Sequence, residues 1–481
     1  MRVRRRPKGM MSRLVASMAA LAVAAGVVAG VAACAPGAPA ATASADASVS
    51  VAGPAGPPTA SPTAGEAEAF GGHGRLAFVS RSRIYVLDGS AAGQTASLHA
   101  IPTGKTTTGT TTTAQTPGSP AWSPDGRWLA FLVGTPSADG AVTTGALWLA
   151  GPDGQDAHQV LPKVDGFAWS PTADELAATS GSGGKLFAVR PGEPTYPMLE
   201  VPGQFDGAPA WSPNGREVAV ATVDLTAAKR FAGSVIDLFV PSEGIVVNSL
   251  ASSRTDALII DGWWASGEGV LAWSDPRDSA SLPADGLPLV SYPLGDAPTA
   301  TLPSTPAYPS FARPDGAGVA LVTGSGRSAD TIMYCTVSGH CGPAQGALPS
   351  PVNLYPASSQ WQGEPDLAFA HCAPQATTAN VTESSLRAWY QTCKLWNVGG
   401  AGGNALAVTR AGAGVAAPTW SSTDGDLLYV RDNALWLIPM RRSDGALSTA
   451  PALPVVGQLF AAGWPNANGH TAWRSQFAWH S

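Results

Sequence analysis

The sequence contains few charged residues, and beyond its first 33 residues basic residues do not outnumber acidic ones. Only 13% of the 481 residues are Asp, Glu, Lys or Arg, about half the usual share. Six of the 28 lysines and arginines lie in the first 33 residues, so the rest of the chain carries 22 basic against 34 acidic residues. Nucleic acids and anionic membrane surfaces select for basic patches. Neither is therefore expected as a ligand.

Familiar catalytic motifs are also missing. The chain has no Gly-x-Ser-x-Gly nucleophile turn, no His-Glu-x-x-His zinc motif and no Gly-x-x-x-x-Gly-Lys phosphate loop. Asp125, Asp315 and Asp424 could suggest a carboxylate set, but each occupies the turn position of a repeat, where Asp bonds its own backbone. We expect no catalytic residue, no metal and no cofactor.

The N-terminus has the features of an export signal. Six basic residues lie within the first 13 positions, and an apolar run follows from Leu14 to Val31. The run ends in Val31-Ala32-Ala33-Cys34, which resembles the bacterial lipoprotein processing site. We expect residues 1–33 to be removed and Cys34 to carry a lipid anchor. The alternatives are an ordinary secretory signal cleaved nearby, or an uncleaved anchor.

A linker follows the proposed anchor. Residues 34–69 are rich in Ala, Pro, Ser and Thr and contain almost no large apolar side chains. Such a composition cannot bury enough surface to fold, and its prolines keep the chain extended. It predicts a disordered tether that holds the folded part away from the membrane, on the extracytoplasmic side.

Cysteine is rare in the rest of the chain. Four cysteines remain apart from Cys34, and an even number in an exported protein predicts disulfides. The expected bridges are Cys335 with Cys341 and Cys372 with Cys393. A metal site is the alternative, because His340 and His371 each precede one of these cysteines, although the spacing matches no zinc motif.

A repeated motif fills residues 70–481. Trp122-Ser123-Pro124-Asp125-Gly126 is followed by an apolar run, and related copies begin at roughly 40- to 60-residue intervals. Pro fixes φ, Asp bonds its own backbone and Gly tolerates positive φ, so each copy predicts a β-hairpin with Trp ending the first strand. The repeat tryptophans are expected to pack between units: Trp122, Trp169, Trp211, Trp264, Trp361 and Trp420.

Further apolar runs complete each unit. A third strand is predicted at 83–89, 147–149, 185–189, 236–240 and 434–438, and a fourth at 158–162. Four short antiparallel strands per repeat make a propeller blade, which buries its apolar faces only against its neighbours. Eight repeat starts predict an all-β propeller of eight blades, with seven as the alternative. Residues 464–481 should return to the first blade and close the ring.

The motif resembles the repeat of TolB-like β-propellers, also described as a WD40-like repeat, over about residues 70 to 481. This resemblance implies a binding platform of the bacterial cell envelope. We expect a monomeric, non-catalytic lipoprotein that binds an envelope protein, peptide or glycan and touches the membrane through its lipid only. The alternatives are a propeller enzyme, such as a lyase or glycoside hydrolase acting on an envelope polymer, and a structural or sensory subunit.

Overall fold

The computed structural model describes residues 68–481 apart from short gaps. These are 92–93, 104–114, 138–139, 181–183, 202, 227–229, 277–285, 296–298, 306–310, 313–317, 324–330, 344–359, 362–366, 374–381, 399–404, 410–413, 423–424, 444–445, 450 and 460–471. The chain divides into units 1–56 and 57–481, and every described residue belongs to the second. The expected signal, Cys34 and the tether up to residue 67 lie outside the described residues.

The copies at Trp122, Trp169 and Trp211 each form the predicted turn between antiparallel strands. Trp122 ends one strand and Leu129, its register partner, begins the next. Gly126 has a φ of 67° and donates its N–H to the carbonyl of Ser123 at 2.9 Å. Side chains are disfavoured at this φ, which explains the recurring glycine. Gly215 repeats both features in a later copy.

The described strands form eight antiparallel sheets of four or five strands, numbered here in chain order, and one separate hairpin. Sheet 1 contains β1 (Gly74–Ser80), β2 (Arg83–Gly89), β3 (Ser97–Ala100) and β35 (Phe477–His480). Sheet 2 contains β4 (Thr116–Trp122), β5 (Leu129–Gly134), β6 (Gly145–Ala150) and β7 (His158–Val164). Sheet 3 contains β8 (Gly166–Trp169), β9 (Leu176–Ser180), β10 (Lys185–Val189) and β11 (Tyr196–Glu200). Sheet 4 contains β12 (Gln204–Phe205), β13 (Ala210–Trp211), β14 (Val218–Leu225), β15 (Phe231–Val240) and β16 (Ile245–Ser253).

The second half of the unit continues the same arrangement. Sheet 5 contains β17 (Asp256–Trp263), β18 (Gly269–Pro276), β19 (Leu287–Pro293) and β20 (Ala300–Thr305). Sheet 6 contains β21 (Phe311–Ala312), β22 (Val319–Thr323), β23 (Thr331–Cys335) and β24 (Cys341–Pro343). Sheet 7 contains β25 (Gln360–Trp361), β26 (Leu367–His371), β27 (Lys394–Val398) and β28 (Ala405–Ala407). Sheet 8 contains β29 (Val415–Trp420), β30 (Leu427–Arg431), β31 (Ala434–Ile438) and β34 (Leu453–Val456). The separate hairpin is β32 (Met440–Ser443) with β33 (Ala446–Thr449).

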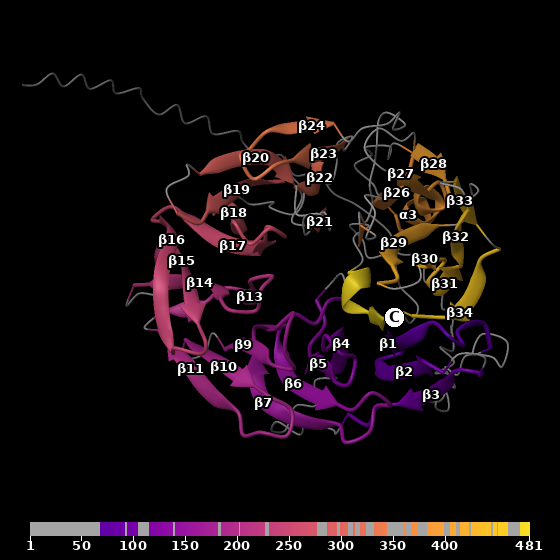
Figure 1. The fold of residues 1–481 in the computed structure, drawn as a ribbon, viewed down its shortest axis with the longest axis horizontal. Helices are drawn as coiled ribbons and strands as arrows, with labels where there is room; N and C mark the ends of the chain where they lie inside the picture. Colours follow the sequence, from indigo (N-terminus) through magenta and orange to yellow (C-terminus); the bar gives the residue numbers. More distant parts are fainter. Residues whose placement is uncertain are drawn as a thin grey trace, which may run out of the picture. The chain divides into compact units, whose positions relative to one another are not determined.

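The sheets follow one another in a closed ring, which makes this unit a β-propeller (Figure 1). The last strand completes the first sheet, because β35 pairs with β1 and places Phe477 opposite Phe78. Sheet 8 meets sheet 1 through Ser80, whose hydroxyl donates to the carbonyl of Gln458 at 2.6 Å, and through Ser422, whose N–H donates to Ser481 Oγ at 2.7 Å. The predicted return of the C-terminal segment is confirmed for β35.

The repeat tryptophans join neighbouring sheets through hydrogen bonds. Trp169 Nε1 donates to the carbonyl of Ala121 at 3.0 Å, and Trp211 Nε1 donates to the carbonyl of Ala168 at 3.1 Å. In both cases the acceptor directly precedes the repeat tryptophan of the previous sheet. The same relation links Trp263 with Ala210 and Trp122 with Ala478. Each of these indoles therefore fixes its sheet against the strand carrying the preceding tryptophan.

In sheet 5 this position belongs to Trp263 instead of the expected Trp264. Trp263 ends β17 and donates the inter-sheet hydrogen bond. Trp264 takes the place of Ser123 in the turn, and its N–H donates to the carbonyl of Gly269 at 3.0 Å. Its fully buried indole donates to Ser291 Oγ at 2.9 Å. Because Trp263 and Trp264 are adjacent, the sequence pattern fits either one as the repeat tryptophan.

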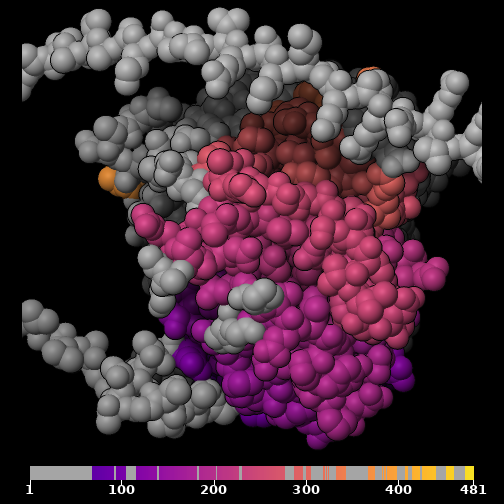
Figure 2. All heavy atoms as spheres, turned by 90° about the vertical axis from the view of Figure 1, so that its left-hand side faces the viewer, coloured from indigo at the N-terminus to yellow at the C-terminus, as the bar shows by residue number. Residues whose placement is uncertain are grey.

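The outermost strand of sheet 4 carries an apolar strip. Ile245, Val246 and Val247 begin β16 and remain 48%, 40% and 45% exposed. Figure 2 shows this side of the molecule, where successive sheets lie against one another in chain order.

Within the described part of the chain, no helix is long and apolar enough to cross a membrane.

Candidate functional site

Asp125, the turn aspartate that the structure describes, interacts with side chains of its own turn. Asp125 accepts a hydrogen bond from Ser123 Oγ at 2.7 Å and pairs with the side chain of Arg127. Desolvation opposes ionisation of Asp125, but hydrogen bonds from the Arg127 backbone and from these two side chains outweigh it and lower its pKa. Asp315 and Asp424 lie outside the described residues. Asp125 therefore acts in the turn, as expected.

Both expected disulfides are present. Cys335 bonds Cys341 across the β23–β24 hairpin, and Cys372 bonds Cys393 in sheet 7. The alternative of a metal site built on these cysteines is wrong, because their sulfurs are consumed in the bridges. No group of three or more His, Cys, Asp or Glu side chains is placed to hold a metal ion in the part of the chain that is described.

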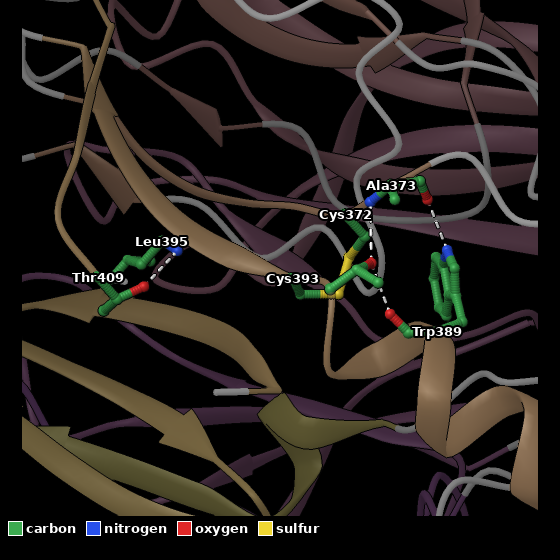
Figure 3. Close-up of a disulfide and its surroundings, with 7 residues drawn as sticks. Cys372, Ala373, Trp389, Cys393, Leu395 and Thr409 are labelled. Carbon is green, nitrogen blue, oxygen red and sulfur yellow. Dashed lines mark hydrogen bonds between the residues drawn. A yellow bond between two sulfur atoms is a disulfide. The ribbon is translucent and has the colours of Figure 1, made fainter. Parts of the chain in front are cut away.

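The second disulfide supports a helical insertion, α3 (Glu383–Tyr390), between β26 and β27. Thr392 accepts a hydrogen bond from the N–H of Ala373 at 3.0 Å, and Trp389 Nε1 donates to the Ala373 carbonyl at 2.7 Å (Figure 3). These contacts flank the Cys372–Cys393 bridge. The C-terminal end of α3 is thereby attached to the two strands of sheet 7.

Local sequence explains the ends of α3. The Thr382 hydroxyl accepts from the N–H of Ser385, and the Ser385 hydroxyl accepts from the N–H of Thr382, which forms a capping box. Tyr390 in the last turn is fully buried, and its burial raises the pKa of its phenol well above the usual value. The phenol therefore packs as a neutral group beneath the helix.

The topology brings α3 to one end of the ring. Successive connections in an antiparallel sheet alternate between its two ends. The β1–β2, β26–β27 and β30–β31 connections therefore lie together, opposite the motif turns. We call this end the insertion face; it carries residues 81–82, α3 and residues 432–433.

A polar cavity of about 330 Å³ opens on the insertion face. Its lining comes from three chain segments: the last turn and C-cap of α3, the β30–β31 turn, and the residues after β34. The lining residues are Arg387, Gln391, Asp432, Asn433, Gly457 and Gln458. They bring one guanidinium, one carboxylate and three amides into a single site.

A strained turn presents the carboxylate. Arg431 and Ala434 are register partners, so Asp432 and Asn433 alone connect β30 to β31. Their φ values are 48° and 66°. A two-residue hairpin with positive φ at both positions favours Asn and Asp among non-glycine residues. The turn chemistry thus selects the same residue types that provide hydrogen-bonding groups to the cavity.

Gly414 makes room for this arrangement. A Cβ atom there would lie 2.9 Å from Asp432 Oδ1, 3.1 Å from Tyr390 Cδ1 and 3.3 Å from Gln391 Nε2. Its φ is 53°, which a side chain would also disfavour. Gly414 therefore allows α3 to approach the β30–β31 turn.

Two hydrogen bonds fix two of the three amides of the cavity. Gln391 Nε2 donates to Asp432 Oδ1 at 2.6 Å and connects sheet 7 to sheet 8. Arg81 donates to Gln458 Oε1 at 2.9 Å and connects sheet 1 to the segment after β34. The cavity thus lies where three consecutive sheets of the closed ring meet.

None of these cavity residues was identified from the sequence. The only local signal was Asp432-Asn433 between two apolar strands, which also describes an ordinary hairpin turn. The lining residues lie 71 positions apart along the chain, from Arg387 to Gln458. Their proximity depends on the packing of sheets 7, 8 and 1.

Comparison with known proteins gives no family assignment. No protein-family model matches the chain, and no curated protein matches it. Solved structures that it resembles include the Porphyromonas gingivalis dipeptidyl peptidase 4, with 9% identity, a TM-score of 0.49 and coverage of 81% of this chain and 59% of that one. TolB from Acinetobacter baumannii gives 14% identity, a TM-score of 0.30 and coverage of 71% and 64%. Pyrococcus horikoshii acylaminoacyl peptidase gives 10% identity, a TM-score of 0.41 and coverage of 70% and 52%, so the match spans about half of that enzyme.

Proposed function

We propose that this chain is an extracytoplasmic lipoprotein whose propeller binds an envelope ligand on its insertion face. The eight sheets are its eight blades, arranged as in TolB-like propellers. Residues 1–33 direct export, Cys34 anchors the mature protein in the cell membrane, and residues 34–69 tether the propeller. The two disulfides support an oxidising compartment outside the cytoplasm.

The main observation that supports this proposal is the polar lining of the cavity. Ligand sites are concave and contain a few convergent polar groups, and a volume of about 330 Å³ lies within the usual range. Among the described residues, the lining combines charged and hydrogen-bonding groups, which can hold a polar ligand.

Capture from membranes tests the proposal. The lipidated protein would be isolated from membranes in parallel with Asp432→Asn and with the control Asp156→Asn. Asp156 is exposed, and its φ of 54° resembles that of Asp432. We expect an envelope component to be recovered with the wild type and the control but reduced with Asp432→Asn, at equal melting temperature.

Two results would contradict the proposal. One is recovery of the same envelope components regardless of changes in the cavity. The other is turnover of an envelope polymer that depends on Asp432, because that result would make the cavity an active site.

A further inference from the structure

The hydrogen-bond partners in the cavity determine which ends of its amides remain for a ligand. A guanidinium can only donate, so the oxygen of Gln458 must face Arg81 and its NH2 group points away from that bond. A carboxylate can only accept, so the nitrogen of Gln391 must face Asp432, and the Gln391 carbonyl is left over. The orientations of both side-chain amides are thus set by their partners, because a guanidinium can only donate and a carboxylate can only accept.

The remaining groups are mixed in kind. Among the described residues, the NH2 group of Gln458 and the carbonyl of Gln391 have no hydrogen-bond partner, and Asp432 uses only one carboxylate oxygen. The cavity therefore offers donors and acceptors at its rim. Among the described lining residues, Arg387 and Asp432 carry opposite charges.

We infer that the cavity recognises a neutral, hydroxyl-rich ligand, that is, a sugar at the end of an envelope glycan. Each hydroxyl both donates and accepts, so adjacent hydroxyls can satisfy an amide NH2, an amide carbonyl and a carboxylate together. An anion would meet the Asp432 carboxylate, and a cation would meet the guanidinium of Arg81, which bonds Gln458. The inference rests on the proposed function and specifies its ligand class.

The binding test uses methyl glycosides of neutral hexoses and pentoses and their short oligosaccharides. Saturation-transfer NMR would identify binders, and calorimetry would measure affinity at low and high salt with the intact propeller. At least one neutral glycoside should bind, with an affinity that changes little with salt, because an uncharged ligand is not screened. Glycylglycine, its N-acetylated form and inorganic phosphate serve as charged comparisons.

Matched variants connect the binding to the cavity. Asp432→Asn preserves a residue type suited to positive φ and an oxygen for Gln391. It removes the charged acceptor and should weaken glycoside binding about tenfold or more. Gln458→Glu keeps an oxygen for Arg81 and removes the NH2 donor, and it should also weaken binding. Asp156→Asn should leave affinity unchanged.

Three outcomes would overturn the sugar assignment. They are the absence of glycoside binding, glycoside binding that Asp432→Asn does not affect, and tighter, salt-sensitive binding of the dipeptide or phosphate. If the dipeptide or phosphate depended on Asp432, the cavity would remain a ligand site and the proposed function would stand. If membrane capture were also independent of every cavity variant, the proposed function would fall as well.

Discussion

Trp122 donates its indole N–H to the carbonyl of Ala478 at 3.1 Å, across 356 positions of the sequence. This contact joins sheet 2 to β35, the strand that completes sheet 1. The same contact joins sheets 2 and 3, sheets 3 and 4, and sheets 4 and 5. The last strand therefore enters the ring through the interaction that the repeat uses between consecutive sheets.

Replacing an inter-sheet tryptophan by Phe should measure this hydrogen bond. Trp211→Phe keeps an aromatic ring but leaves the Ala168 carbonyl without the indole donor. Trp420 is 3% exposed, and its Nε1 has no hydrogen-bond partner in the described part of the chain. We expect Trp211→Phe to reduce the free energy of unfolding by about 1 kcal/mol more than Trp420→Phe does. Denaturant unfolding would measure both, and equal losses would show that packing alone matters.

Gly414→Ala should damage the cavity as well as the backbone. Its φ of 53° costs about 1 to 2 kcal/mol with a side chain, and the new methyl would press on Asp432 and Gln391. Gly192→Ala is a matched control, because Gly192 has a φ of 79° with no atom within 4 Å of its Cβ position. Both variants should melt earlier, but only Gly414→Ala should lose ligand binding. Binding that survives in Gly414→Ala would separate the cavity from this contact.

The two disulfides should contribute unequally to stability. The loop from Cys372 to Cys393 spans 21 residues and the loop from Cys335 to Cys341 spans six. Loop-closure entropy predicts about 3 kcal/mol for the longer loop and about 2 kcal/mol for the shorter one. Double Ser variants of each pair would be compared by denaturant unfolding. The Cys372/Cys393 variant should also weaken ligand binding, since it loosens α3; unaffected binding would contradict this role of the bridge.

Acid should destabilise the propeller through His480. Burial lowers the pKa of this half-buried imidazole, and the nearby Arg75 charge acts in the same direction. The folded state thus favours neutral His480, so its contribution to stability is complete above the unfolded pKa of about 6.5 and is lost as pH falls through the lower folded value. His480→Gln should reduce the fall in melting temperature between neutral pH and about pH 5. An unchanged fall would exclude His480 as a cause, and His158→Gln tests an exposed histidine in the same way.

The anchor can be tested independently of the fold. Cys34→Ala should move the protein from the membrane to the soluble fraction without changing its melting temperature, because the residue precedes the propeller. Fractionation and melting of the purified variant would measure both effects. Continued membrane association would instead indicate an uncleaved N-terminal segment.

Local chemistry made much of the fold predictable. The turn between Trp122 and Leu129 needs Gly126 at positive φ and an Asp that bonds its own backbone, and these requirements are met by adjacent residues. The third strands predicted at 83–89, 185–189 and 434–438 coincide with β2, β10 and β31, because each strand is a short run of adjacent apolar residues. The sequence did not distinguish Trp263 from Trp264, because both are aromatic and only the turn hydrogen bonds separate them.

Neighbouring residues are enough to predict the hairpins, several of the strands and the candidate disulfide pairs. Contacts between distant parts of the chain set which sheets meet at β35 and which side chains surround the cavity. Gln391, Asp432 and Gln458 carry no shared pattern, since each follows from its own helix end, turn or strand end. They come together because sheets 7 and 8 pack side by side, and closing the ring adds Arg81 from sheet 1; no local periodicity records either contact.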